Sequence, residues 1–317
     1  MPSSQTAHPR ERADRCPGVI RTWPADDGML ARIRLVGGRI APDALRALSS
    51  IAATYGDGRV HPTSRANLQL RGLPGGGERL DEEVVRAIAA AGLLPSRAHD
   101  LVRNIMLSPL TGRAGGRADL WPVASRLDLL VLASARLADL PGKFLFVLDD
   151  GRGDLVGRAA DLGVVALDER VGQLRVGSGW GEIVDLADAP EALVALAHSF
   201  LDARGSDGSS AWHVDELAAP LLPATAPDHR VPKPAAPLPF GRVPGGFHHG
   251  AYDDGLDQSA VDALTATLPP GITAPLVVTP WRGVLVPDEA SAPPSPESGA
   301  AADPAARATT PTDQRPR

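Results

Sequence analysis

The chain has 317 residues, a formal net charge of −6 at pH 7 and a pI near 5.8. Hydrophobic residues make up 43% of it, so a core is available, while the acidic balance argues against a dedicated nucleic-acid binder. No apolar run approaches the length of a membrane span, and residues 1–15 hold no apolar signal-peptide core. A single cysteine excludes an internal disulfide framework, and these features together predict a soluble cytoplasmic protein.

Three stretches lack the apolar pattern of folded protein. Residues 1–14 are polar, and residues 287–317 contain no Leu, Ile, Val, Met or aromatic residue. Such segments bury too little surface to offset the entropy of ordering, so we expect disordered ends over 1–14 and 289–317. Residues 219–239 are rich in Pro and Ala and look unfolded, which predicts an extended linker within 206–239.

The first structured block, residues 15–94, alternates strand and helix patterns. Strands are expected over 28–35 and 59–71, and amphipathic helices over 41–56 and 77–94. Strand–helix–strand–helix with short links indicates a small α+β sandwich, ferredoxin-like in plan.

The strand expected over 59–71 has two unlike faces, because strand side chains alternate in direction. The apolar face consists of Ala66, Leu68 and Leu70. The other face is a row of polar side chains with two guanidinium groups: Thr63, Arg65, Asn67, Gln69 and Arg71. One interpretation is the solvated face of an antiparallel sheet. The other is a surface for an anionic ligand, since the planar fork of Arg binds carboxylates bidentately.

Two further blocks follow. The second, residues 95–205, shows strand patterns at 101–110, 142–154, 162–169 and 172–180 and helix patterns at 118–140 and 189–203. The third, residues 240–288, shows a helix at 257–268 and then a strand at 274–287. That last strand weakly echoes the first block, because Arg65 and Arg282 both follow a Thr inside an apolar strand and align if one residue is inserted.

Other polar groups allow a metal or cofactor site but have simpler explanations. His248 and His249 could bind a metal ion. They lie in a glycine-rich stretch that also predicts a flexible surface loop, and no carboxylate is spaced to complete a metal site. Three carboxylates suit a cation, although turn formation explains them equally well: Asp149, Asp150 and Asp154. The glycine-rich segment 176–181 opens no helix and indicates a turn or a close approach to a cofactor.

Four motifs occur together in a known order. They are "CPGVIRTWPADDGMLARIRLVGGRI" (16–40), "TSRANLQLRGL" (63–73), "VRNIMLSPLTG" (102–112) and "LPGKFLFVLDDGRGD" (140–154). This set resembles the nitrite and sulfite reductase superfamily, with the precorrin-3B synthase family of cobalamin biosynthesis as its most similar branch. The resemblance implies two ferredoxin-like half-domains (15–94 and 240–288) with an intervening α/β siroheme-type lobe (95–205).

The resemblance also implies site residues. Thr63, Arg65 and Gln69 match a strand motif that lines a pocket for a tetrapyrrole with many carboxylates, and Asn67 and Arg71 extend the same face. Arg103 and Asn104 match an Arg-Asn pair that contacts the tetrapyrrole and the substrate anion. Lys143 matches the first of two lysines that bind the substrate anion, whereas Leu145 stands where the second would be. A cluster of four cations would then neutralise several carboxylates together: Arg65, Arg71, Arg103 and Lys143. No catalytic residue is identified.

The cofactors that the resemblance implies are a siroheme-type tetrapyrrole and a [4Fe–4S] cluster. A cluster needs about four thiolates, and this chain has only Cys16, so no cluster is expected on it. The second lobe is also missing, which indicates a shortened enzyme or one completed by a second polypeptide. Two functions remain open: an oxidoreductase like precorrin-3B synthase, whose family reaction hydroxylates precorrin-3A with dioxygen and forms a lactone, or a non-catalytic tetrapyrrole-binding fragment, a degenerate remnant.

Overall fold

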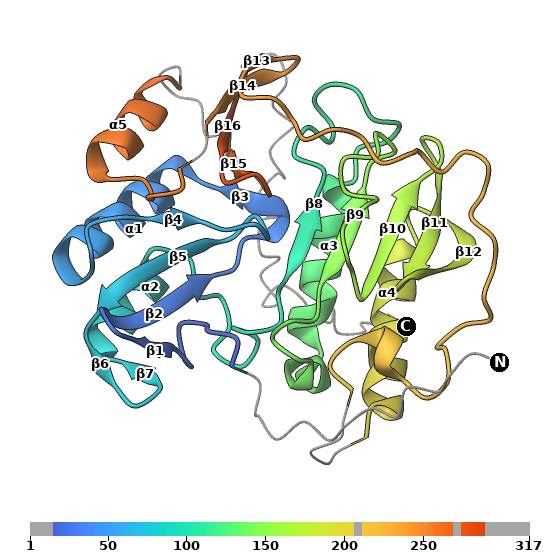
Figure 1. Cartoon of the computed structure of the whole chain (residues 1–317), viewed down its shortest axis with the longest axis horizontal. Coiled ribbons are helices and arrows are strands. Elements are labelled where there is room, and N and C mark those ends of the chain that lie inside the picture. Colours follow the sequence, from blue (N-terminus) through green and yellow to red (C-terminus); the bar gives the residue numbers. More distant parts are fainter. Residues whose placement is uncertain (1–14, 206–210, 251, 269–273, 289–317) are drawn as a thin grey trace, which may run out of the picture.

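The computed structural model describes residues 15–205, 211–250, 252–268 and 274–288. It is an α+β structure in which two small half-domains stack on one another and an α/β lobe lies beside both of them (Figure 1). The ends expected to be disordered, 1–14 and 289–317, lie outside the described residues. No helix among the described residues is long and apolar enough to span a bilayer.

The first half-domain is an antiparallel sheet with helices on one face. Its strands, in spatial order, are β1 (Trp23–Ala25), β2 (Gly28–Ile33), β5 (Leu68–Leu73) and β4 (His61–Pro62). The apolar side of β2 and β5 packs on α1 (Pro42–Tyr55) and α2 (Glu82–Ala90) in one hydrophobic core. A small hairpin of β6 (Gly75–Gly76) and β7 (Arg79–Leu80) leads into α2.

The single strand expected over 59–71 is wrong: it is a hairpin. β4 pairs antiparallel with β5, and residues 63–67 form the turn between them. The turn closes through the Thr63 N–H, which donates to the Asn67 carbonyl at 2.9 Å, and the Ala66 N–H, which donates back to the Thr63 carbonyl at 3.0 Å. Ala66 therefore adopts a left-handed φ of 57°. Such a residue interrupts strand alternation, so Thr63, Arg65 and Asn67 do not share one face.

The second half-domain repeats this plan and is joined to the first. Its sheet has the order β13 (Gly241–Val243), β14 (Gly246–His249), β16 (Val284–Pro287), β15 (Leu276–Val278) and β3 (Arg39–Ile40). Strand β3 comes from the first half-domain, and α5 (Gln258–Ala266) packs beside α1. Because strands and helices of both halves contribute to one continuous core, the two halves form a single packed unit.

The strand expected over 274–287 is likewise wrong, and the true repeat lies in its turn. Residues 279–283 bond as residues 63–67 do: the Thr279 N–H donates to the Gly283 carbonyl at 2.9 Å, and the Arg282 N–H donates to the Thr279 carbonyl at 3.1 Å. Arg282 is left-handed, with φ 58°. The two turns match without an insertion, so Arg282 corresponds to Ala66, and Trp281 stands where Arg65 stands.

The lobe is a mixed five-stranded sheet covered by two helices. Its order is β12 (Gly179–Asp185), β11 (Val171–Val176), β10 (Leu162–Ala166), β9 (Phe146–Asp149) and β8 (Ile105–Leu107). Strands β8, β9 and β10 are parallel, and β11 and β12 add antiparallel strands at one edge. Helices α3 (Trp121–Ala133) and α4 (Ala189–Ala203) pack on its apolar face.

Three short 3₁₀ helices connect these elements within the part of the chain that the structure describes. They are η1 (Val36–Gly38), η2 (Ala135–Asp139) and η3 (Val214–Glu216). Helix η1 lies against β8 and joins β2 to β3, and therefore sits at the junction between the first half-domain and the lobe.

The linker is fastened to the lobe over its described part, in contrast to the unfolded segment expected over 219–239. The Gln173 side chain donates to the Ala226 carbonyl at 3.0 Å and accepts the Asp228 N–H at 2.8 Å. Farther along, the Ala235 N–H donates to the Gly153 carbonyl at 2.8 Å. A Pro-rich segment has few backbone donors of its own, so these bonds to the lobe hold it extended across the molecule to the second half-domain (Figure 1).

Candidate anion-binding cleft

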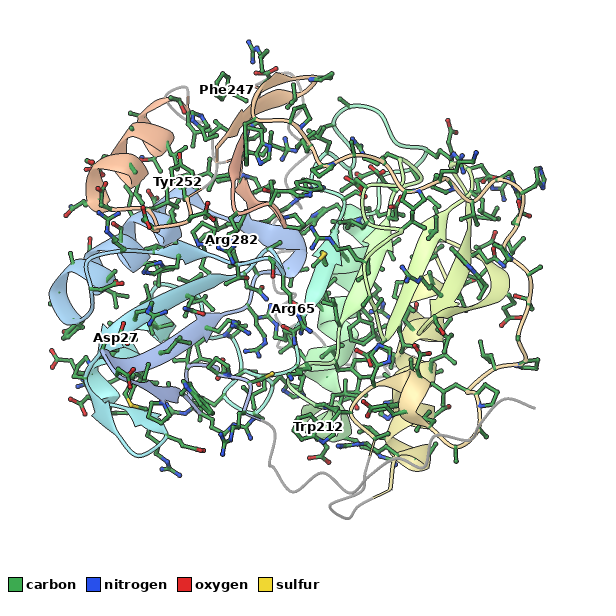
Figure 2. All side chains as sticks on the ribbon, in the orientation of Figure 1. Asp27, Arg65, Trp212, Phe247, Tyr252 and Arg282 are labelled. Atoms are coloured by element: carbon green, nitrogen blue, oxygen red, sulfur yellow. The ribbon has the colours of Figure 1, made fainter. Side chains whose placement is uncertain are left out.

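Two adjoining cavities lie where the first half-domain meets the lobe, and Lys143 and Trp212 line both. One cavity measures about 340 Å³ and the other about 480 Å³. Arg65 and Asp161 line the smaller one, and Arg32 and Trp23 the larger. Figure 2 shows Arg65 at the centre of the molecule, between the two parts, with Trp212 below it. We call the two cavities together the cleft.

Arg65 reaches the cleft from the turn between β4 and β5. The left-handed residue after it, Ala66, ends the strand-like run and leaves Arg65 at the tip of the turn. Its Nη1 donates to the Lys143 carbonyl at 2.9 Å, a bond that ties the first half-domain to the lobe. The side chain is half-buried and keeps further donors for a ligand.

Lys143 is the second cation of the cleft. It directly precedes Phe144, and both Phe144 and Phe146 are fully buried in the core of the lobe and fix the backbone at this point. Its Nζ lies 5.9 Å from the ring centroid of Trp212, within the range of a cation–π contact. The residue is exposed, so the ammonium group is available to a ligand in either cavity.

Arg32 is a third cation, and the family motifs did not single it out. It lies on the polar side of β2, where its Nη2 donates to the Gln69 side chain at 3.4 Å. Its Nε is buried and has no hydrogen-bond partner in the described residues. Burial lowers the pKa of Arg32, the Cys16 thiol opposes this, and the positive charge of Arg65 adds to it. The alternation of Leu30, Arg32 and Arg34 in the sequence was the available signal.

Acidic groups make the smaller cavity mixed in charge. Asp161 accepts the Leu145 N–H at 2.9 Å and the Val214 N–H at 3.2 Å, so it anchors the segment that carries His213. Burial raises the pKa of Asp161 to about 6, and the His213 ring, 3.8 Å away, opposes this. The exposed Glu216 lies nearby in the same cavity. The smaller cavity therefore holds two cations, Arg65 and Lys143, together with the carboxylates of Asp161 and Glu216.

Asn67 and Asn104 belong to the structural interface rather than to the cleft. Both are buried, and the Asn67 side chain accepts the Leu35 N–H at 2.9 Å. The Asn104 side chain donates to the Gly142 carbonyl at 3.0 Å and accepts from Arg34 Nε at 2.9 Å. Neither residue lines the cavities.

Thr63, Arg71 and Arg103 also have structural partners. The Thr63 hydroxyl accepts the Asn67 N–H at 3.1 Å inside the turn. Arg71 pairs with Asp27 at 2.9 Å, and Arg103 makes a two-pronged bond to Asp128 of α3 at 2.7 and 2.8 Å. Arg71 and Arg103 do not line the cleft, so the expected cluster of four cations is reduced to Arg65 and Lys143, to which the structure adds Arg32.

The sequence suggested that His248 and His249 lie in a flexible loop, and the structure contradicts this. Both lie in β14, and His248 is fully buried. One ring nitrogen of His248 lies 2.9 Å from the Thr279 hydroxyl and the other 3.1 Å from the Pro239 carbonyl. These contacts hold the 279–283 turn and the end of the linker, and they occupy both ring nitrogens.

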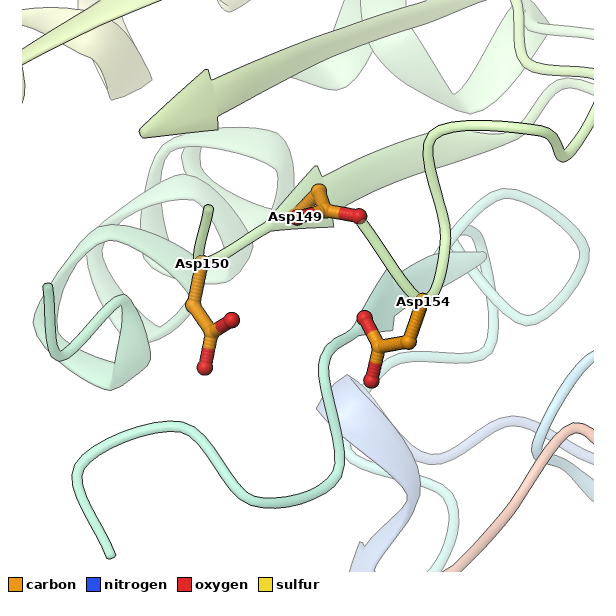
Figure 3. A group of neighbouring side chains, drawn as sticks. All are labelled: Asp149, Asp150 and Asp154. Carbon is orange, nitrogen blue, oxygen red and sulfur yellow. The ribbon is translucent and has the colours of Figure 1, made fainter. Parts of the chain in front are cut away.

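The three carboxylates after β9 are close together (Figure 3). Asp149 accepts backbone N–H groups from Gly151, Gly153 and Leu155. Asp150 pairs with the Arg152 side chain, and Asp154 accepts the Ser108 hydroxyl at 2.6 Å. These bonds account for the cluster as a structured turn.

The fold is that of two ferredoxin-like half-domains with an α/β lobe, and comparison with known proteins agrees. Residues 24–77 match the family described as the nitrite/sulfite reductase ferredoxin-like half domain. The Mycobacterium tuberculosis NirA protein has a similar fold, with a TM-score of 0.64 and 18% sequence identity over 86% of this chain and 59% of that one. The chain therefore resembles the nitrite/sulfite reductase superfamily, and the family model itself covers residues 24–77.

Curated relatives match over shorter segments. A ferredoxin–nitrite reductase of Synechococcus elongatus is 31% identical over 45% of this chain and 29% of its own length. A precorrin-3B synthase of Sinorhizobium is 36% identical over 20% of this chain and 14% of its own length. A ferredoxin–nitrite reductase of Leptolyngbya laminosa is 33% identical over 32% of this chain and 20% of its own length. The chain thus spans less than a third of the length of the curated relatives it matches.

Proposed function

We propose that the cleft binds an anionic tetrapyrrole and that the chain is part of an oxidoreductase like precorrin-3B synthase. The observation that carries the proposal is the meeting of Arg32, Arg65 and Lys143 on one cleft from three separate elements. A ligand with several carboxylates on one ring edge would exchange water for these fixed donors. Hydrogen bonds to charged groups contribute roughly 1.5–3 kcal/mol each.

The shape and lining of the cleft support this ligand class. Cavities of about 340 and 480 Å³ lie within the range of roughly 300–1,000 Å³ typical of small-molecule sites. Trp23, Trp212 and Leu30 supply apolar walls for a macrocycle face. The Arg32 Nε, buried without a hydrogen-bond partner in the described residues, is a donor that a carboxylate would satisfy.

The residues present fit a tetrapyrrole but not an iron–sulfur cluster. Arg32, Arg65 and Lys143 would hold the carboxylates of a siroheme-type group, which supplies redox chemistry at its iron when bound. A [4Fe–4S] cluster takes about four cysteine thiolates, and Cys16 is the single cysteine of the sequence. We therefore assign this chain the holding and orienting of the tetrapyrrole, and derive no step through a cluster.

A titration with a matched control tests the proposal. Uroporphyrin III, which carries only carboxylate substituents, is added to the purified chain and followed by absorbance and by quenching of tryptophan fluorescence. Arg65→Ala should weaken binding by about 10- to 100-fold, and Arg65→Lys should recover only part because the planar fork is lost. Arg71→Ala, which removes a neighbouring Arg held by Asp27 outside the cleft, should bind like the wild type.

Two outcomes would refute tetrapyrrole binding at this cleft. One is equal affinity of Arg65→Ala and the wild type. The other is an absence of saturable binding by any of the proteins. Added salt provides a second readout: affinity should fall with ionic strength, because exposed charges are screened over about 10 Å at 0.1 M salt.

The single cysteine favours a second candidate, a tetrapyrrole-binding module without redox activity of its own. For this second candidate, a second polypeptide supplies the lobe that binds the cluster. Anaerobic reconstitution with iron and sulfide, followed by metal analysis and EPR, tests the module. It predicts uroporphyrin binding without a stoichiometric cluster, and a cluster bound to each chain would refute it.

A further inference from the structure

A groove that no described residue fills lies on the helix side of the second half-domain. It measures about 650 Å³ and runs between the end of α5 and the sheet. Its lining comes from β13, β14, β16 and the segment after α5: Arg242, Phe247, His249, Thr267, Val286, Pro287 and Asp288. Phe247 is 41% exposed at its centre. An exposed ring beside the buried Val286 is unusual on the core-facing side of a sheet.

The internal repeat identifies the matching surface in the first half-domain. Because the turns 63–67 and 279–283 correspond, Val286 corresponds to Leu70. Phe247 pairs with Val286 as Ala31 pairs with Leu70, so Phe247 occupies the position of Ala31. The same register assigns β13, β14, β15 and β16 to β1, β2, β4 and β5, and α5 to α1.

One element of the first half-domain has no counterpart among the described residues of the second. That element is α2, whose Val84, Val85 and Ile88 are buried in one core with Ala31 and Leu70. Ala31 and Leu70 are fully buried there, whereas Phe247 in the second half-domain is not. The groove therefore lies on the face that α2 covers in the first half-domain.

We propose that this groove docks one amphipathic helix of a partner polypeptide, in the manner of α2. The helix would present two or three branched apolar side chains at i, i+1 and i+4, as α2 does, to Phe247 and Val286. Charged residues at its ends would meet the exposed pair of Arg242 and Asp288 at the rim, 2.7 Å apart. This proposal is independent of ligand binding in the cleft.

Two other occupants fit the groove less well. Residues 289–317 directly follow β16, but they contain no Leu, Ile, Val, Met or aromatic residue and so have no apolar stripe to offer. A second copy would have to pair this patch with itself across a two-fold axis. A concave groove is not complementary to another concave groove, whereas a convex helix is.

The test uses the chain's own α2 as a probe. A fluorescein-labelled peptide of residues 79–94, with an i,i+4 lactam on its solvent face to keep it helical, is titrated with the intact protein by anisotropy. The control peptide carries Val84→Asp and Ile88→Asp. Saturable one-to-one binding of the first peptide only is expected, with reduced hydrogen exchange in β14 and β16. Phe247→Asp should weaken binding by at least tenfold, and it should leave uroporphyrin affinity unchanged.

Three results would overturn the proposal. The first is no saturable binding at millimolar peptide. The second is equal binding of both peptides, or of Phe247→Asp and the wild type. The third is a concentration-dependent dimer in sedimentation that Phe247→Asp abolishes, since a second copy would then be the occupant. A melting curve and circular dichroism of Phe247→Asp confirm that the variant is folded, which is expected because Phe247 is already partly exposed.

Discussion

Ala66 and Arg282 have the same left-handed backbone, with φ of 57° and 58°, at the same position of two corresponding turns. In the described residues they are the only non-glycine residues with positive φ. In each turn a threonine three residues earlier accepts their N–H and closes the loop. The repeat is thus expressed in backbone geometry more than in sequence, since Arg65 in one turn corresponds to Trp281 in the other.

Arg282→Gly should stabilise the protein. A left-handed conformation costs an L-residue with a Cβ roughly 1 kcal/mol, and glycine adopts it freely. The exposed ion pair of Arg282 with Asp253 at 3.1 Å contributes little. Urea unfolding should show a gain of about 1 kcal/mol for Arg282→Gly, with no gain for Arg282→Ala, which keeps the Cβ. An equal gain in both variants would point to charge removal instead.

The same turns explain what the sequence could predict about the fold. Helices and strands were found because apolar periodicity is a local property, and the four motifs indicated the half-domain architecture. The turns 63–67 and 279–283 were missed because each is short and is flanked on both sides by residues with a strand pattern. Left-handed positions are usually marked by Gly, Asn or Asp, and here Ala and Arg occupy them.

The sequence predicted only part of the candidate site, because the left-handed turn and the tertiary pairings were not visible in it. Arg65 and Lys143 line the cleft, in line with their motifs. Asn67 follows the left-handed Ala66, which shifts the phase of alternation and turns its amide inward. Arg103 finds Asp128 on α3, a tertiary pairing that its local sequence does not reveal. Ligand binding by the predicted residues stays a prediction.

Arg34→Ala should destabilise the protein strongly. Arg34 is buried between the first half-domain and the lobe and donates to Asn104 Oδ1 at 2.9 Å, and also to the Pro17 and Asp100 carbonyls at 3.1 and 2.9 Å. Burial lowers its pKa to about 10, and the nearby Asp100 partly opposes this. Removing the side chain leaves buried acceptors unpaired, at a cost of roughly 3–5 kcal/mol.

Arg34→Lys is the matched variant. It keeps the charge but offers a single donor head in place of the fork, so thermal melting should give it a stability between that of Arg34→Ala and the wild type. A loss below about 1 kcal/mol for Arg34→Ala would show that this network does not hold the two parts together.

Asp154→Asn should make stability less dependent on pH. Burial raises the pKa of Asp154 to about 7, the Ser108 hydroxyl opposes this, and Asp149 adds to it. The folded state therefore holds a proton that the unfolded state releases near pH 4. The stability that this proton provides is fully present below about pH 4 and is lost progressively as pH rises from there through 7.

Denaturant curves at pH 5 and pH 8 measure this effect. The stability of the wild type relative to Asp154→Asn should fall by on the order of 2 kcal/mol between the two pH values. Asn keeps an acceptor for the Ser108 hydroxyl, so the variant should remain folded. Asp168→Asn, at a partly exposed site outside this turn, is the control and should show no such loss with rising pH. If the stabilities of Asp154→Asn and the wild type changed equally between pH 5 and pH 8, Asp154 would not be the group that holds this proton.

Arg32→Met should raise the free energy of unfolding and at the same time lower the affinity of the cleft for its ligand. The buried Nε of Arg32 has no hydrogen-bond partner in the described residues, which costs the folded state about 1–3 kcal/mol. Met retains most of the stem packing without the buried charge. Urea unfolding should therefore show a gain of about 1 kcal/mol, while uroporphyrin III affinity should fall about tenfold, because one charged donor is lost. Arg71→Met, outside the cleft, is the control and should change neither quantity by a comparable amount. A less stable Arg32→Met would make Arg32 a structural residue, and an unchanged affinity would remove it from the site.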